Sequence, residues 1–351
     1  MKANRPEAAE WVSLTCSRRL RWLPKPGMTD AAYHTIDSSM ILVVSPNLAV
    51  DQTVHVDHLV VGQVHRSKST RREPGGKGVN VARVLTTLEV SCLLTGFVGG
   101  AHGQLISEGL KREKIPFRPC PMRNESRTCY LFVDDERLQQ TVINEPGPNV
   151  DAEEVSALVS AFQQEIPACK WVVFSGSLPP GVPAGLYAEL IAAAQAAGKR
   201  TLVDCSGSAL RPAAQARPFL LKINHAEAES LTEAPVGNVH QAVQAAAELQ
   251  SQYAPLVMIT LGAAGAVLAS DDDKYLFIPP TIQARNTVGS GDATLAGLMA
   301  GLIQGLPIEE LGKLATAAGA ANALHGGGHC SKGEIEELRP RVQCRRMSGQ
   351  E

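Results

Sequence analysis

Aromatic residues and net charge are both scarce in this sequence. Phe, Trp and Tyr together make up 4% of the 351 residues, and the formal net charge is -2 at pH 7. Base-stacking surfaces need aromatic side chains, and binding to nucleic acid or to an anionic membrane needs a strongly basic surface. We therefore expect neither nucleic acid nor a membrane as a partner.

Paired cysteines and long apolar runs are also lacking. The eight cysteines are scattered, and none forms a C-x-x-C pair beside a histidine cluster, so a zinc site is not expected. Scattered single cysteines are typical of free thiols in a reducing compartment. No apolar run approaches the ~18 residues that a membrane span needs. These patterns predict a cytoplasmic protein.

The sequence does contain a regular alternation of apolar runs and helical patterns after Met40. Helices are predicted over 81–88, 151–166 and 184–200; Asp151 and Glu154 fit a capping box, and Gly198 fits a helix C-terminus. The runs lack polar alternation, which is typical of strands buried in a parallel sheet. We expect an α/β fold, with a doubly wound, mostly parallel sheet flanked by helices. Its strands are predicted at 41–45, 92–99, 171–177, 201–207, 219–224 and 256–262.

Two polar stretches, 51–74 and 117–145, interrupt this alternation inside the predicted domain 40–338. Their pattern indicates antiparallel strands, either as ordinary surface hairpins or as a small β-sheet lid that excludes water from a reaction. Residues 1–39 show neither the helical nor the strand periodicity of apolar residues. We expect a disordered extension, an over-called start with Met40 as the natural beginning, or a regulatory or targeting arm. Residues 339–351 are polar and predict a frayed tail.

A glycine-rich turn precedes the helical pattern that begins near residue 291. The amides of Gly289, Ser290 and Gly291 would point at one spot, and a helix N-terminus favours anions. Such a spot stabilises a phosphoryl group in transfer. Asp292 would there accept the proton of an attacking hydroxyl, although a helix-start carboxylate with no such role is the simpler alternative.

A second glycine cluster, in EPGGKGVNVARVL, is not a Walker A loop. Gly75 and Gly76 allow close approach of the backbone to a ligand, and Asn80 in the following helix offers a donor and an acceptor to sugar hydroxyls. Asp51 follows the first strand, where ligands collect in parallel sheets. A tight turn and a turn aspartate are the alternatives.

Further candidates lie after later strands and on the predicted lid. Asn224 and Glu227 have a spacing suited to Mg²⁺, with Lys222 beside them for phosphate. Arginine forks grip phosphate, so Arg66 and Arg127 would hold a phosphorylated substrate, unless they are solvated surface charges. Ser177, at the end of a predicted strand, could add a hydroxyl group. Gly262 and Gly265 form a turn that either lies against a nucleotide or is a plain turn.

Five motifs occur in an order that resembles the ribokinase/PfkB family of carbohydrate kinases: GGKGVNVARVL, FSGSLPPG, LKINHAE, ITLGAAGAVL and NTVGSGDATLAG. The resemblance spans roughly 40–338, and within the family the chain looks like the branch of 1-phosphofructokinases and tagatose-6-phosphate kinases. It implies a ribokinase-like fold with a β-sheet lid, often shared across a dimer. ATP and Mg²⁺ are the implied co-substrate and metal.

The resemblance also implies a role for each candidate. Asp292 would be the base and Gly289, Ser290 and Gly291 the anion hole. The sugar would be held by Asp51, Gly75, Gly76 and Asn80, and its phosphate by Arg66, Arg127 and Ser177. The ATP site would include Lys222, Asn224, Thr260, Gly262 and Gly265, with Glu227 and Asn224 organising Mg²⁺. Some family members use K⁺, and Asn286 and Val288 are the matching positions.

The chain departs from the family's usual consensus sequence at two of these motifs. G-S-G-D replaces G-A-G-D, and K-I-N replaces K-P-N, with His225 and Ala226 at usually acidic positions. We expect an ATP-dependent phosphohexose kinase that acts on fructose 1-phosphate. The alternatives are a tagatose-6-phosphate or fructose-6-phosphate kinase and a catalytically silent, sugar- or nucleotide-binding regulator of the same fold. A dinucleotide oxidoreductase is not expected, because the chain lacks the G-x-G-x-x-G spacing of such enzymes.

Overall fold

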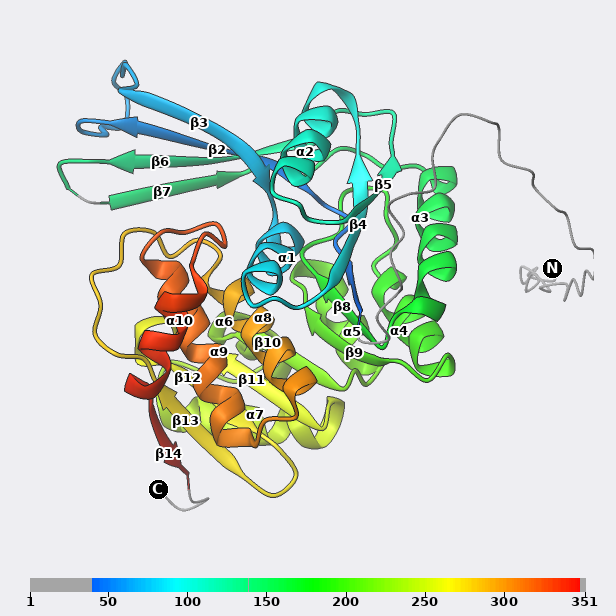
Figure 1. The fold of residues 1–351 in the computed structure, drawn as a ribbon, viewed down its shortest axis with the longest axis vertical. Coiled ribbons are helices and arrows are strands. Elements are labelled where there is room, and N and C mark those ends of the chain that lie inside the picture. The colour runs from blue at the N-terminus through cyan, green and yellow to red at the C-terminus, as the bar shows by residue number, and fades with distance from the viewer. Residues whose placement is uncertain (1–39, 138, 348–351) are drawn as a thin grey trace, which may run out of the picture. The chain divides into compact units, whose positions relative to one another are not determined.

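A ten-stranded sheet and a separate four-stranded sheet organise the chain (Figure 1). The computed structural model describes residues 40–137 and 139–347, so the predicted extension 1–39 lies outside the described residues. In the large sheet the seven strands β5, β4, β1, β8, β9, β10 and β11 pair with one another in parallel. The pairs β11–β12, β12–β13 and β13–β14 are antiparallel. In spatial order its strands are β14 (Gln343–Arg346), β13 (Lys274–Ile278), β12 (Ala266–Ala269), β11 (Leu256–Thr260), β10 (Leu220–Asn224), β9 (Arg200–Asp204), β8 (Trp171–Ser175), β1 (Ile41–Val44), β4 (Cys92–Val98) and β5 (Phe117–Pro121).

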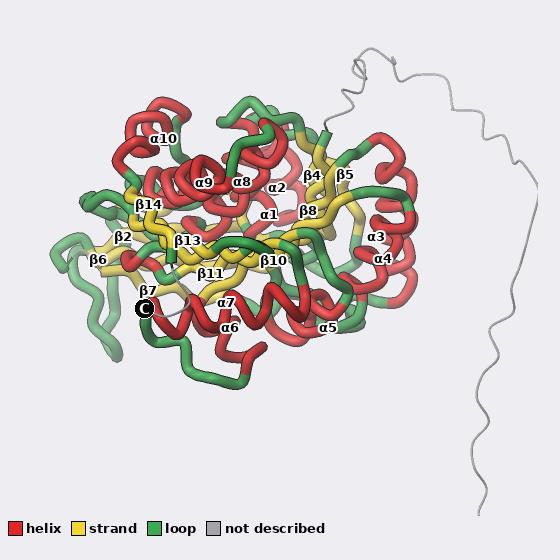
Figure 2. Tube along the Cα trace, turned by 90° about the horizontal axis from the view of Figure 1, so that it is seen from below, coloured by secondary structure: helices red, strands yellow, loops and turns green. Residues whose placement is uncertain are grey.

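Helices cover both faces of the large sheet, as Figure 2 shows. The strands alternate their side chains between two cores: in β1, Ile41 and Val43 face one and Leu42 and Val44 the other. The doubly wound, mostly parallel fold is therefore confirmed. One face carries α1 (Lys77–Thr87), α2 (Gly100–Arg112), α8 (Ser290–Gln304), α9 (Ile308–Ala323) and α10 (Lys332–Leu338); the other carries α3 (Ala152–Glu165), α4 (Leu186–Ala196), α5 (Leu210–Gln215), α6 (His225–Thr232) and α7 (Val239–Tyr253).

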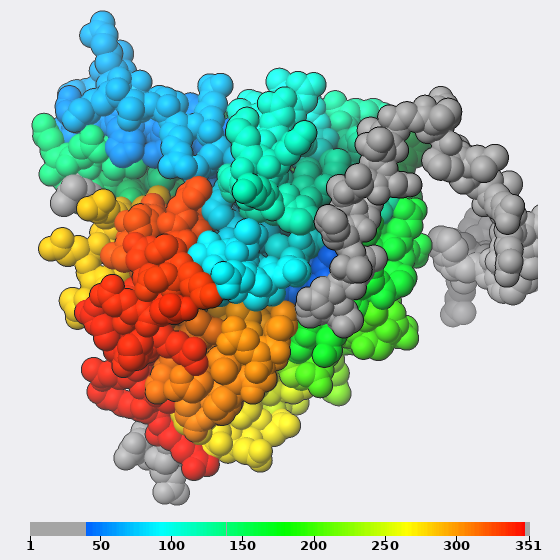
Figure 3. Space-filling model, viewed as in Figure 1, coloured from blue at the N-terminus to red at the C-terminus, as the bar shows by residue number. Residues whose placement is uncertain are grey.

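The second sheet projects at one end of the domain, above the segments that lead into α8 and α10 (Figures 1 and 3). Its strand order is β3 (Ser69–Gly75), β2 (Ala49–Val56), β6 (Arg127–Asp134) and β7 (Gln139–Asn144). The hairpins β2–β3 and β6–β7 are antiparallel, as predicted, but β2 and β6 pair in parallel.

Two segment boundaries differ from those predicted. The stretch 117–121 is β5, which pairs with β4 at the edge of the large sheet instead of joining the small one, because Phe117 and Cys120 pack into the cores beside it. The tail is not frayed at its start: β14 pairs with β13, and Cys344 packs against the core. Within the described residues, no helix is long and apolar enough to cross a membrane.

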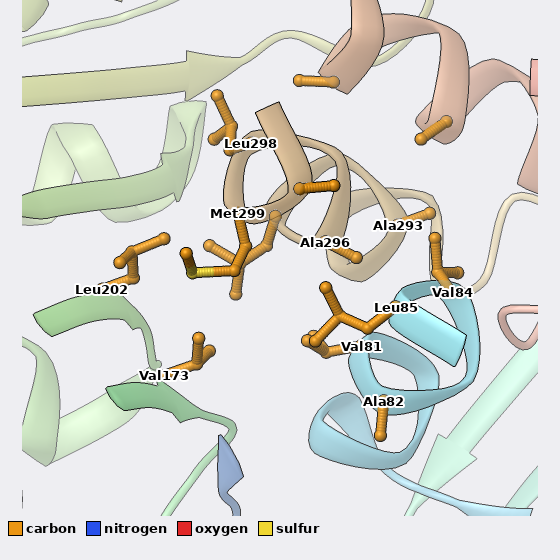
Figure 4. Packing of buried hydrophobic residues seen from close by; sticks show 14 of the residues in the cluster. Val81, Ala82, Val84, Leu85, Val173, Leu202, Ala293, Ala296, Leu298 and Met299 are labelled. Carbon is orange, nitrogen blue, oxygen red and sulfur yellow. The ribbon is translucent and has the colours of Figure 1, made fainter. Parts of the chain in front are cut away.

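The packing of α1 against α8 fixes the floor of the site. Val81 and Leu85 of α1 lie beside Ala296 of α8, while Met299 points toward Val173 and Leu202 on the sheet (Figure 4). These side chains are fully buried, so the starts of both helices are held rigidly at the carboxyl ends of the strands. That is the edge at which parallel α/β sheets bind ligands.

Candidate active site

A large open pocket of about 2320 Å³ lies between the second sheet and the carboxyl ends of the main strands. Its wall combines β2, β3, β6 and β7 with the ends of β10 and β11 and the start of α8. Of the predicted site residues, all line this pocket except Gly75, Arg66 and Glu227. The fold therefore brings together motifs that are more than two hundred residues apart in the chain.

The start of α8 forms the deep end of the pocket. Gly289 has φ 82° and ends the preceding loop in the left-handed region, which favours glycine. The helix begins at Ser290, one residue before the predicted start, and its amides open onto the pocket. Asp292 lies in the first turn and is 5% exposed. Burial raises the pKa of this carboxyl, and the nearby Lys77 opposes that rise.

Two lysines share one buried carboxylate at this end. Lys77 Nζ contacts Asp204 Oδ1 at 2.6 Å, and Lys222 Nζ contacts Asp204 Oδ2 at 2.8 Å. Burial alone would raise the pKa of Asp204, but Lys222 and Lys77 outweigh it and hold that pKa below its usual range. Two ammonium groups facing one carboxylate leave a net positive charge, which suits a phosphate.

Lys222 also adjoins the α8 amides directly. A Cβ atom added to Gly291 would lie 2.7 Å from Lys222 Nζ. The Lys222 ammonium group therefore lies beside the first turn of α8, where helix amides favour an anion. Sequence reasoning missed Lys77 and Asp204 here, because the strand was predicted at 201–207 and Asp204 fell inside it, whereas in the structure Asp204 is the last residue of β9.

Asp51 and Asn80 stand on the wall next to Asp292. Asn80 Nδ2 donates to Asp292 Oδ2 at 2.8 Å. Burial and the neighbouring Glu73 raise the pKa of Asp51 to about 7. A Cβ atom on Gly75 would lie 2.0 Å from Asp51 Cγ, so Gly75 is required by the close approach of this carboxyl group. Gly76 lines the pocket and precedes α1.

The two arginines predicted to hold phosphate differ in position. Arg127 lines the pocket, and its guanidinium donates to the carbonyl oxygens of Asn47 and Glu145 at 2.8 to 3.2 Å. Arg66 lies on the exposed loop between β2 and β3, away from the pocket lining. Within one copy of the chain Arg66 therefore does not reach the pocket, because the β2–β3 hairpin extends away from it.

Asn47 is a pocket residue that sequence reasoning missed. Its Nδ2 donates to Ser177 Oγ and to the Pro146 carbonyl, both at 3.0 Å. Its Oδ1 is buried with no hydrogen-bond partner among the described residues. A buried acceptor without a donor is costly, so Oδ1 is suited to receive a ligand hydroxyl. The residue lies in the short loop that follows β1, and its position after the first predicted strand could have signalled it.

Asn224 and Glu227 form a capping box at the start of α6. Asn224 Oδ1 accepts from Glu227 N and Glu227 Oε2 accepts from Asn224 N, both at 2.9 Å. No three His, Cys, Asp or Glu side chains in 40–137 and 139–347 form a group that could hold a metal ion. Mg²⁺ often takes only one or two protein oxygens besides water and phosphates, which this donor set fits.

The predicted K⁺ positions, Asn286 and Val288, take part in hydrogen bonds of the loop before α8. The Val288 carbonyl accepts from Asn322 Nδ2 and from Gly327 N, each at 2.9 Å. Asn286 Oδ1 accepts from Val288 N at 2.9 Å. A carbonyl oxygen has two lone pairs, and both are used here. These hydrogen bonds do not test the K⁺ site at Asn286 and Val288, which stays a prediction.

A buried carboxylate beside helix amides and two lysines, at the strand ends of a doubly wound sheet, defines an α/β phosphotransferase. The model of the pfkB family carbohydrate kinases matches residues 44–332. The chain belongs to this family and is a sugar kinase, which confirms the family predicted from the motifs.

Named relatives agree with this assignment. The chain is 33% identical to the 1-phosphofructokinase of Bacillus subtilis over 81% of this chain and 93% of that protein. It is 35% identical to the 1-phosphofructokinase of Rhodobacter capsulatus over 79% of this chain and 88% of that protein. Among solved structures, phosphofructokinase-2 from Escherichia coli in complex with substrates and products aligns with a TM-score of 0.81 and 27% identity, covering 86% of this chain and 98% of that one.

Proposed function

We propose that this kinase transfers the terminal phosphoryl group of ATP to fructose 1-phosphate, forming fructose 1,6-bisphosphate and ADP. The observation that carries the proposal is the buried Asp292 carboxylate beside the α8 amides and the two lysines. The names of the relatives support the choice of sugar. Tagatose 6-phosphate and fructose 6-phosphate remain the alternative substrates.

In the proposed mechanism Asp292 accepts the proton of the sugar's free hydroxyl as its oxygen attacks the terminal phosphorus of ATP. The bond from that phosphorus to the bridging oxygen breaks, and ADP leaves with the bond's electron pair. The amides of Gly289, Ser290 and Gly291 and the ammonium group of Lys222 stabilise the negative charge on the phosphoryl oxygens. Lys77, held against Asp204, adds a second positive charge.

Each substrate has its own part of the pocket in this proposal. Asp51 and Asn80 bind sugar hydroxyls, while Arg127 and Ser177 hold the phosphate already on the sugar. Asn224, Thr260, Gly262 and Gly265 line the ATP side. Mg²⁺ would be held through Glu227 with Asn224 beside it, and when bound it neutralises charge on the ATP phosphates.

The test is ADP release with Mg-ATP against fructose 1-phosphate, fructose 6-phosphate, tagatose 6-phosphate, free fructose and ribose. The highest kcat/KM is expected with fructose 1-phosphate. Turnover with free sugars alone would contradict the phosphate-binding role of Arg127. ATP binding without turnover of any sugar would favour a regulator over an enzyme.

We also propose a homodimer formed through the second sheet. Its outer strands are open edges, and large exposed hydrophobic side chains gather there: Val61 and Val64 on the β2–β3 loop, and Val142 and Ile143 on β7. Across such a dimer Arg66 would face the pocket of the second copy. Sedimentation of the wild type and of a Val61→Lys, Val64→Lys variant tests this; a wild-type monomer at assay concentration contradicts it.

The same proposal places the enzyme in the cytoplasm. Every cysteine among the described residues is a free thiol, which suits a reducing compartment. Detection of the chain in fractionated cells tests this location, and recovery from an oxidising compartment contradicts it.

A further inference from the structure

Arg83 lies on α1, one turn beyond Asn80, behind the pocket wall. It is 7% exposed and does not line the pocket. Its Nε and Nη2 donate to the two oxygens of Glu113 at 2.7 and 3.0 Å, and Nη2 also donates to the Pro74 carbonyl at 3.0 Å. Its Nη1 donates to the Gly327 carbonyl and, at 3.3 Å, to Asn80 Oδ1.

A guanidinium has five N–H donors, and each of them has an acceptor here. The acceptors come from the end of α2, the end of β3, the loop after α9 and α1 itself. Because every donor is used and the side chain is shut off from the pocket, Arg83 does not bind a substrate. Two of its acceptors, the Gly327 carbonyl and the Asn80 amide, belong to residues that line the pocket, and of these two only the Asn80 amide contacts Asp292.

That contact fixes which way the amide faces. A primary amide can turn over and exchange its oxygen and nitrogen. Arg83 only donates, so it requires Oδ1 on its own side. Nδ2 is then left on the other side, where it donates to Asp292 Oδ2 at 2.8 Å. The reversed amide would set N–H against N–H at Arg83 and oxygen against oxygen at Asp292.

We propose that Arg83 is a positioning residue for phosphoryl transfer: through the Asn80 amide it holds Asp292 Oδ2, so that Oδ1 stays directed at the substrate hydroxyl. The inference rests on the proposed role of Asp292 as the base. A carboxylate that accepts one hydrogen bond from a fixed donor cannot rotate freely, and general-base catalysis depends on that alignment.

The charged groups that face Asp292 are Lys77 from α1, Asp204 from β9 and Lys222 from β10, and Asp51 faces it from β2. Lys77 and Lys222 are held by Asp204 and do not contact Arg83. Loss of the Asn80 donor would therefore leave these charges in place while removing one group that favours ionised Asp292. The acid limb of the rate profile should then move to higher pH.

Arg83→Lys tests this, because one ammonium group cannot reach the acceptors that the guanidinium spans. We expect kcat to fall by about 10- to 100-fold, the KM for ATP to stay unchanged, and the acid limb of the kcat profile to move to higher pH. Arg339→Lys is the matched control: Arg339 pairs with Glu310 at 2.7 Å, neither residue lines the pocket, and the substitution should leave the profile unmoved.

A double-mutant cycle with Asn80→Ala separates positioning from general support of the fold. If Arg83 acts through Asn80, the double variant loses no more kcat than Asn80→Ala alone. Losses that multiply, or a folded Arg83→Lys with a wild-type pH profile, would overturn the proposal. If Arg83→Lys does not fold, Glu113→Gln is used instead, because it weakens the hydrogen bonds that hold the same guanidinium. It should move the acid limb in the same direction by a smaller amount. An unmoved pH profile in Glu113→Gln would also overturn the proposal.

Wild type and Asp292→Asn are measured beside these variants. Wild-type turnover that depends on Asp292, together with an unmoved profile in the Arg83 variants, removes the positioning role alone. Absence of such turnover in the wild type removes the proposed function, and the positioning role with it.

Discussion

The two ends of the pocket are built differently. At the end formed by the main sheet, Asp204, Lys222 and Asp292 are buried, and fixed strand ends and the packed helices α1 and α8 hold them. At the second-sheet end, strands β3 and β7 are open edges, and one link to the rest of the domain is a contact at 3.0 Å between Glu73 and His329. In the proposed function, Asp292 and the two lysines act from the packed main-sheet end, whereas Asp51 and Arg127 act from β2 and β6 of the second sheet, a layer with open edges.

The largest effect is expected at the rigid end. Asp292→Asn keeps the shape of the side chain but cannot accept a proton, so kcat should fall by about 10²- to 10⁴-fold while ATP binding is retained. Steady-state ADP release and ATP titration measure both. Asp272→Asn, on an exposed turn, is the matched control. Near-normal turnover of Asp292→Asn would remove the distinction between the two ends.

A smaller and more selective effect is expected at the second-sheet end. Arg127→Ala should raise the KM for the phosphosugar by about 10- to 100-fold, because hydrogen bonds to a charged group are lost. The KM for ATP should change little. Arg137→Ala, on the exposed turn between β6 and β7, serves as the control. Equal rises in both KM values would show that Arg127 supports the whole pocket and not one substrate.

The pH dependence of sugar binding sharpens the comparison further. The pKa of Asp51 is raised to about 7, so below that pH most of this carboxyl is protonated and accepts sugar hydroxyls less well. The KM for the phosphosugar should rise by about tenfold between roughly pH 8 and pH 6, since one pKa unit is a tenfold change in population. Asp51→Asn should abolish the trend. A KM that falls on acidification would contradict the assignment.

The smallest effect is expected from monovalent cations. Because the Val288 carbonyl is already occupied by Asn322 and Gly327, replacing K⁺ by Na⁺ at constant ionic strength should leave kcat unchanged. Strong activation by K⁺ would mean that these hydrogen bonds give way to an ion. The matched variant is Asn322→Ala, which removes one of the two donors to this carbonyl and should create a cation response that the wild type lacks.

The sequence predicted buried structure better than edges. Strands β1, β4, β8, β9, β10 and β11 were placed within a few residues, because runs of apolar residues on both faces define them locally. Strands β5 and β14 were not, since each is short and exists only where it meets the edge of β4 or β13. Pairing of that kind depends on distant partners, which no local pattern contains.

The site residues likewise divide into those that a local motif reveals and those that meet only in the folded chain. Asp292 and the glycines before it are neighbours in the chain, and their joint position could be inferred from one motif. Lys77 and Asp204 are 127 residues apart, and their contact appears only in the folded chain. Asn224 and Glu227 show an ambiguity of a different kind: one spacing serves both a capping box and a metal site, as Asp151 and Glu154 at the start of α3 illustrate.

Strand β14 has a consequence for how copies of this protein behave in a crowded solution. It covers the hydrogen-bonding edge of β13, where Tyr275, Leu276 and Phe277 would otherwise offer an apolar template to another chain. It is itself short and bears Arg345 and Arg346, and charged side chains on a short border strand discourage further pairing. We therefore expect that a chain cut before β14 would aggregate more readily than the intact chain, because the edge of β13 would be uncovered far along the sheet from Asp292.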